Sequence, residues 1–173
     1  MPTTPSGARV ALASEGSVNV ATGLSVLDHL VGELARAGRF KIALEVAPDS
    51  TDEAVPAAGA ALGSAIADHF RAGAGWAMMP ASEALASAAL EVDPEPRFVT
   101  NADFSDSRVG GVANDVPSRF LAELAQSAGI NLHVRVVEGD DPQHVLAAMF
   151  KAVGAALGQA CRLAAPTDEE ENA

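Results

Sequence analysis

The sequence predicts an α+β fold of two similar tandem halves, each a small mixed or antiparallel sheet packed on helices. Helical and strand periodicities alternate along the chain, and one helix–turn–strand pattern recurs at a constant offset. Of the 173 residues, 49% are hydrophobic, which is enough to bury a sizeable core. We therefore expect one domain over residues 8–165, with repeats at about 8–93 and 94–165.

The first half contains strands, a helix, a strand and a second helix, in that order. One or two short strands are expected within residues 8–21. Apolar residues at helical spacing predict a helix over residues 24–37, which Gly38 is expected to end. Alternation over residues 40–46 predicts a strand with one buried face, and a helix of small residues follows over about 55–70.

The second half repeats this pattern about 90 residues later. A helix around residues 120–128, a strand over 130–136 and a helix over about 143–163 follow one another. Pro142 suits the first turn of the last helix, where its missing N–H would be unpaired anyway. Three pairs of apolar positions keep one offset: Leu30 with Phe120, Leu34 with Leu124, and Leu44 with Val134.

The segment between these patterns predicts a helix over residues 81–90, and then strand and loop at 98–104 and 109–112. Two GAALG strings, at residues 59–63 and 154–158, require a different offset. We interpret them as ordinary alanine–glycine helix composition.

The charge of the chain excludes several classes of function. A formal net charge of −12 disfavours binding to nucleic acid and to anionic membranes, and a phosphorylated substrate would need a local basic pocket. Residues 166–173 form an acidic tail that is expected to be disordered.

Cys161 is the single cysteine, which excludes an internal disulfide and indicates a reducing, cytoplasmic location. Its place in an alanine-rich helix predicts a small packed residue.

Spacing alone gives weak indications of a catalytic or metal site. The chain lacks HxxxH, HExxH and CxxC motifs, so an ordinary surface or half-buried histidine is the simpler interpretation of each of its four: His29, His69, His133 and His144. The carboxylates of Asp49, Asp52 and Glu53 could bind a hard cation, although a solvated acidic loop is the simpler interpretation.

At residues 22–30 the string TGLSVLDHL resembles the TG-x-x-x-LDHM element of the imidazoleglycerol-phosphate dehydratase family, which acts in histidine biosynthesis. The resemblance runs in order over about residues 16–163 and includes GINLHVRV at 129–136. It implies a fold like domain 2 of ribosomal protein S5. It also implies a homo-oligomer of 24 subunits with manganese sites shared between chains. The reaction of the family converts imidazole glycerol phosphate to imidazole acetol phosphate.

The resemblance also assigns metal ligands, and most of them are missing. His29 and His133 match the histidines of the LDH and LHV elements. The first HHxxE motif aligns with Asp52, Glu53, Ala54, Val55 and Pro56, and the second with Gln143, His144, Val145, Leu146 and Ala147. The candidate metal ligands are therefore His29, His133 and His144, with Asp52 or Glu53 as oxygen replacements. No catalytic residue is assigned.

The family's phosphate-binding residues are also replaced. Glu95 stands where the family has an arginine in SGRPY, and Arg97 is a weak substitute two residues further on. The basic RR-x-G segment aligns with AGAGW, and the C-terminal Ser-Thr-Lys-Gly element is absent. A carboxylate at such a position would repel a phosphate.

These losses favour a divergent homologue that lacks dehydratase activity and acts as a structural or binding protein. We expect no cofactor, or manganese if part of the family site is retained. The alternatives are a metal-dependent lyase of altered specificity and a dehydratase with relocated ligands. A homo-oligomer is expected, with a trimer or smaller assembly as an alternative to the 24-mer, and no nucleic-acid or membrane partner.

Overall fold

The computed structural model describes residues 7–45, 51–103, 108–109, 112–113 and 115–162. In its first sheet the central strand β3 (Phe40–Glu45) pairs antiparallel with β1 (Gly7–Leu12) and parallel with β2 (Ser17–Ala21). Helices α1 (Ser25–Gly38) and α2 (Thr51–Ala67) pack against this sheet. The strands, the first helix and the small-residue helix predicted for this half are confirmed, with α2 beginning about one turn early.

The second sheet has the strand order β4–β5–β9–β6. Helices α3 (Asp115–Ala128) and α4 (Pro142–Ala160) cover one of its faces, and Pro142 opens α4 as expected. A two-stranded ribbon joins β7 (Arg108–Val109) to β8 (Val112–Ala113). The four strands of the sheet are β4 (Ala74–Ala81), β5 (Ala84–Val92), β6 (Arg97–Thr100) and β9 (Ile130–Glu138).

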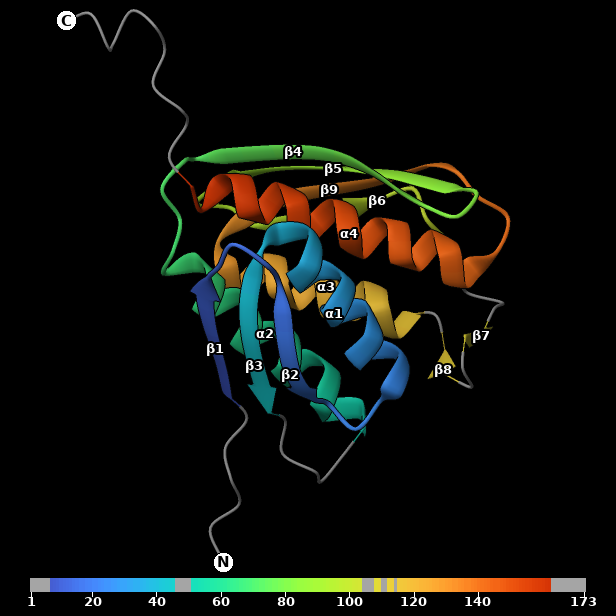
Figure 1. Ribbon diagram of the computed structural model, residues 1–173, viewed down its shortest axis with the longest axis horizontal. Coiled ribbons are helices and arrows are strands. Elements are labelled where there is room, and N and C mark those ends of the chain that lie inside the picture. The colour runs from blue at the N-terminus through green and yellow to red at the C-terminus, as the bar shows by residue number, and fades with distance from the viewer. Residues whose placement is uncertain (1–6, 46–50, 104–107, 110–111, 114, 163–173) are drawn as a thin grey trace, which may run out of the picture.

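The helices lie between the two sheets, so the molecule has a sheet–helix–helix–sheet arrangement (Figure 1). Across the middle, α1 packs on α4 and α2 packs on α3. Buried aliphatic side chains and the stacked rings of Phe120 and Phe150, whose centroids lie 5.9 Å apart, fill this region. The predicted α+β class with tandem halves is confirmed.

Strand register shows how far the two halves correspond. In the first sheet Val10 faces Ile42, and in the second Leu90 faces Leu132, each on a strand antiparallel to the central one. Strands β5, β9 and β6 therefore reproduce β1, β3 and β2, with β4 added at the edge. The predicted repeat boundary between residues 93 and 94 stays a prediction, while the pairing of β5 with β9 favours a boundary near residue 73.

The helix predicted over residues 81–90 is wrong, because this segment is the β4–β5 hairpin. Ser82 makes the turn with a φ of 51°, and Ala84, Ala86 and Ala88 alternate with more exposed residues along β5. Strand β5 lies directly against α4, where small side chains permit close packing. Tertiary packing thus outweighs the helix propensity of alanine.

The helix α1 ends at Gly38, but the left-handed residue that terminates it is Arg39 and not the glycine. Gly38 is the last helical residue, and Arg39 takes the left-handed conformation, with φ 56° and ψ 52°. A Cβ at Gly38 would overlap the carbonyl of Gly154, so close helix packing requires glycine there. At the equivalent point of the second half, Gly129 has the positive φ of 69°. The acidic tail at 166–173 and Asp49 lie outside the described residues.

Candidate functional site

His144 is held at the first turn of α4 by a carboxylate from the β4–β5 turn. Its Nδ1 lies 2.6 Å from Oε2 of Glu83, and the other oxygen of Glu83 accepts the backbone N–H of Asp141 at 2.9 Å. Asp141 caps α4 by accepting the N–H of Gln143 at 2.8 Å. Because an ionised carboxylate can only accept, Nδ1 of His144 donates to it and Nε2 remains available.

The electrostatics of Glu83 follow from these hydrogen bonds. The backbone N–H of Asp141, then the N–H of Glu83 itself and the side chain of His144, lower the pKa of Glu83 from 4.5 to about 2. Glu83 is therefore ionised throughout the physiological range, and it orients the imidazole of His144.

His29 lies on α1, at the side of the molecule where α4 begins. With Gln143 and Leu146 of α4 it borders a cavity of about 200 Å³. Thr22 and Asp28 fix the start of this helix: the Thr22 N–H and hydroxyl both donate to the Asp28 carboxylate, the N–H at 3.0 Å. The TG-x-x-x-LDH element therefore has a structural role beside its histidine.

His133 is separated from the other two histidines. It is exposed on the outer face of the second sheet, where β9 places it between Ala89 of β5 and Val99 of β6. It borders a shallow hollow of about 280 Å³ with Asn131 and Glu91. The helices cover the opposite face of this sheet, so His133 points away from α1 and α4.

The remaining predicted site residues lie elsewhere in the fold. Asp52 and Glu53 lie in the first turn of α2, and their side chains are outside the described part of the chain. Arg97 begins β6 and forms an ion pair with Glu95, with 3.5 Å between Nη2 and Oε2. His69 contacts the carbonyl oxygen of Val10 through Nε2 at 2.7 Å, which gives it a structural role.

The side chains described at these positions do not form the manganese site that the resemblance implies. Among the residues whose positions are described, no three histidine, cysteine, aspartate or glutamate side chains group closely enough to hold a metal ion. Ala147, one turn after His144, has a methyl group, and Pro56 lies inside α2 without a donor side chain. The described residues of one chain therefore do not fit manganese.

Sequence reasoning did not single out two polar residues near this site. No pattern in the sequence marks Glu83, and only the fold shows that it contacts His144 at the start of α4. Lys151 donates to the carbonyl of Pro80 at 3.1 Å and lies 3.9 Å from the carboxylate of Glu33. The sequence feature that could have identified Lys151 is its charge among the apolar positions of α4.

The fold and these side chains define a class: two-repeat α+β proteins that carry histidines on the first helix, the second central strand and the last helix. The chain belongs to the imidazoleglycerol-phosphate dehydratase family, because the sequence model of that family matches residues 22–157.

Relatives in sequence agree with this assignment. The imidazoleglycerol-phosphate dehydratase of Pelobacter propionicus is 32% identical over 156 residues, which are 86% of this chain and 80% of the relative. That of Methanocella arvoryzae is 31% identical over 159 residues, covering 87% and 82% of the two chains.

Two crystal structures share the fold. The imidazoleglycerol-phosphate dehydratase of Staphylococcus aureus has a TM-score of 0.76 at 21% identity, covering 87% of this chain and 90% of the other. That of Pyrococcus furiosus, in complex with (S)-C348, has a TM-score of 0.77 at 20% identity and covers 98% of both chains. In the described part of this chain, none of the helices has the length and apolar character needed to cross a membrane.

Proposed function

We propose that this chain is a member of the family that lacks dehydratase activity and serves as a structural or binding homologue in the cytoplasm. The observation that carries the proposal is the loss of both glutamates of the aligned ligand motifs, replaced by Pro56 and Ala147. Neither replacement has a side-chain atom that can bind a metal ion.

The helix geometry of α4 supports the proposal at the second motif. Ala147 is three positions after His144, so the two residues are neighbours on one helix face. A glutamate at 147 would add a carboxylate beside the imidazole, whereas alanine adds only a methyl group. Gln143 supplies a neutral amide in place of the other histidine.

The charge at β6 supports the same proposal. Glu95 occupies the position aligned with a phosphate-binding arginine, and its carboxylate is paired with Arg97. A phosphate at this place would meet one negative and one already paired positive group. Repulsion by a like charge reduces both affinity and association rate.

Manganese binding tests the proposal. The double substitution Gln143→His with Ala147→Glu restores the aligned motif beside His144. We expect the variant to bind Mn²⁺ at least about tenfold more tightly than the wild-type chain. Removing a residue that only hydrogen-bonds to a metal ligand already changes metal affinity by this factor. Calorimetric titration of both proteins measures this difference, with His144→Ala as the matched control.

Tight, stoichiometric Mn²⁺ binding by the wild-type chain that is lost in His144→Ala would contradict the proposal. Light scattering on the same samples, with and without chelator, measures assembly. We propose a homo-oligomer whose size does not change when metal is removed, a trimer or smaller rather than a metal-held 24-mer.

A metal-dependent lyase of altered specificity is the second candidate. The His144–Glu83 pair favours it, because a carboxylate on one ring nitrogen orients a histidine that binds a metal through the other. Manganese, zinc or iron in stoichiometric amount in the purified protein would favour this candidate over the first. A dehydratase with relocated ligands would in addition convert imidazole glycerol phosphate.

A further inference from the structure

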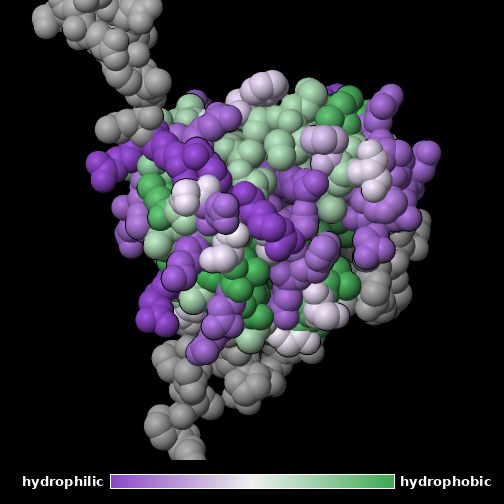
Figure 2. Space-filling view, in the orientation of Figure 1, coloured by the Kyte–Doolittle hydropathy of each residue, from purple (hydrophilic) through white to green (hydrophobic). Residues whose placement is uncertain are grey.

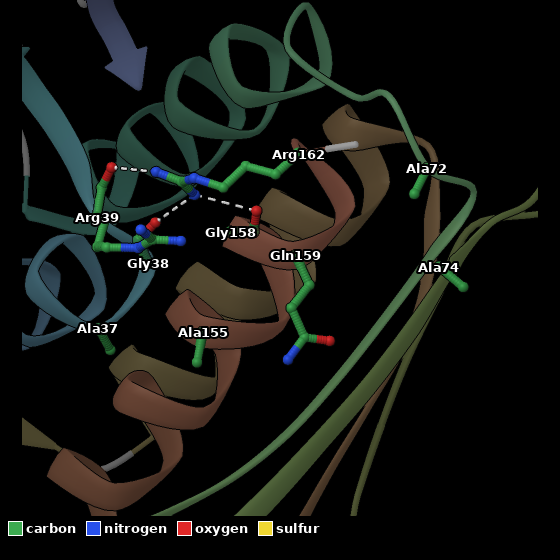
Figure 3. Close-up of a pocket in the computed structure, with 9 residues that line it drawn as sticks. All are labelled: Ala37, Gly38, Arg39, Ala72, Ala74, Ala155, Gly158, Gln159 and Arg162. Atoms are coloured by element: carbon green, nitrogen blue, oxygen red, sulfur yellow. Dashed lines mark hydrogen bonds between the residues drawn. The ribbon is translucent and has the colours of Figure 1, made fainter. Parts of the chain in front are cut away.

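A cavity of about 580 Å³ lies at the end of the molecule where α1 and α4 terminate and β4 begins (Figure 3). Its volume is within the range of small-molecule sites. Apart from two arginines and one glutamine, the residues that line it are alanine and glycine: Ala37, Gly38, Ala72, Ala74, Ala155 and Gly158. No carboxylate is among the described residues that line this cavity.

Arg162, which follows the end of α4, has a fixed position in the wall. Its Nη1 donates to the carbonyls of Gly38 at 2.8 Å and Gly158 at 3.0 Å, and its Nη2 to those of Arg39 at 2.8 Å and Ala13 at 3.2 Å. These bonds hold the guanidinium at the ends of both helices, as three of them show in Figure 3. Its Nε–H makes none of these four bonds.

Arg39 brings a second positive charge to the same wall. Its left-handed backbone turns the chain at the end of α1, and its exposed side chain forms no ion pair with any described residue. By contrast, Arg36 and Arg97 are each paired with a glutamate. Among the described residues, none of the hydrogen bonds uses the guanidinium N–H groups of Arg39 either, so these residues do not compete with a ligand for its five donors.

Gln159 provides a neutral donor on the neighbouring face. Its Oε1 accepts the backbone N–H of Trp76 at 3.0 Å, which orients the amide. Because the oxygen is used toward β4, the Nε2 group is left to donate on the cavity side (Figure 3).

The charge at this place is unusual for the chain. The protein carries a net charge of −12, yet two guanidinium groups share one cavity without a carboxylate. Burial, and then the charge of Arg39, lower the pKa of Arg162, which indicates that a like charge acts on its guanidinium, while no carboxylate is among the described lining residues. A bound anion would relieve this repulsion.

We propose that this cavity binds a small anionic molecule bearing phosphate or carboxylate groups, held by Arg39, Arg162 and Gln159. Guanidinium groups match the oxygens of both ligand types and bind them through charge-assisted hydrogen bonds. None of these three residues is at a position that the family resemblance assigns to phosphate or metal. Ala72 and Ala74 of the wall lie in the segment aligned with the basic RR-x-G of the family, but they supply no charge, so the proposal rests on Arg39, Arg162 and Gln159 alone.

Calorimetric titration with sodium phosphate and with sodium citrate, at an ionic strength held constant with sodium chloride, tests the proposal. We expect saturable binding of at least one anion to the wild-type chain, and the arm that binds identifies the ligand chemistry. Arg39→Gly should weaken it about tenfold or more, the scale of a lost hydrogen bond to a charged group. Glycine suits the backbone at this position, so the variant is expected to fold.

Gln159→Glu is the second variant, because it keeps the acceptor for Trp76 and adds a negative charge to the cavity. It should weaken binding as well, whereas Arg135→Ala, on the outer face of the second sheet, should not. Failure of both anions to bind saturably would overturn the proposal. Binding that is unchanged in Arg39→Gly and Gln159→Glu would also overturn it.

Discussion

The residue that follows the first helix of each half has a left-handed backbone conformation. Arg39 and Gly129 follow equivalent helices and share a positive φ, 56° and 69°. The second half uses glycine, for which this backbone conformation is unstrained, whereas the first half uses an arginine at a cost of about 1 kcal/mol. A side chain kept at a strained position is consistent with the ligand-binding role that we propose for Arg39.

Cys161 gives a prediction about pH at the residue scale. Burial raises the pKa of its thiol from 9.0 to about 11, while the Arg162 charge acts in the opposite direction. The thiolate fraction at pH 8 should be about a hundredfold smaller in the folded than in the unfolded chain. Alkylation by iodoacetamide at pH 8 should therefore be slow until urea unfolds the protein. Equal rates in both states would contradict this assignment.

The same pKa shift affects stability at high pH. Because the folded-state pKa is raised, the contribution of Cys161 to stability is complete below pH 9 and is lost as pH rises from 9 to 11. The unfolding temperature should fall over this interval, and Cys161→Ala should reduce that fall.

At the scale of elements, close helix crossings depend on glycine. An added Cβ at Gly154 of α4 would overlap the backbone of Leu34 on α1, and one at Gly63 of α2 would meet the backbone of Leu124 on α3. Leu34 and Leu124 are equivalent repeat positions, so the two helix pairs cross in the same way. The two GAALG strings contain these glycines at different places, in agreement with their different offset.

Gly154→Ala tests this packing. We expect a loss of about 1–3 kcal/mol in the free energy of unfolding, the usual cost of overpacking, despite the better helix propensity of alanine. Gly73→Ala is the matched control, because its Cβ would meet nothing within 4 Å. Urea denaturation measures both variants, and equal stability of the two would show that the crossing tolerates a side chain.

These elements also show what sequence can predict. Periodicity located α1, β3, α3 and β9, because each has one apolar face in a regular pattern, whereas α4, which is buried on most sides, was located as a long run of small and apolar residues after Pro142. It failed over residues 81–90, where alanine on a strand has the composition of a helix. The extent of β4 and its edge position could not be predicted, since they depend on packing against α4.

At the scale of the whole molecule, the sequence predicted the candidate metal ligands but not their arrangement in space. The resemblance identified His29, His133 and His144, but not where they lie relative to one another. Glu83 is 61 residues from His144 in sequence and reaches it only through the hairpin turn. Likewise, Arg39 and Arg162 share a cavity because α1 and α4 end at the same side of the protein.

Turnover tests the central claim most directly. The wild-type chain, supplemented with manganese, is incubated with imidazole glycerol phosphate, and imidazole acetol phosphate is measured over time. The relative from Pelobacter propionicus serves as the reference under the same conditions. We predict no product above the level of a heat-denatured sample, whereas repeated turnover by the wild-type chain would contradict the proposed loss of dehydratase activity.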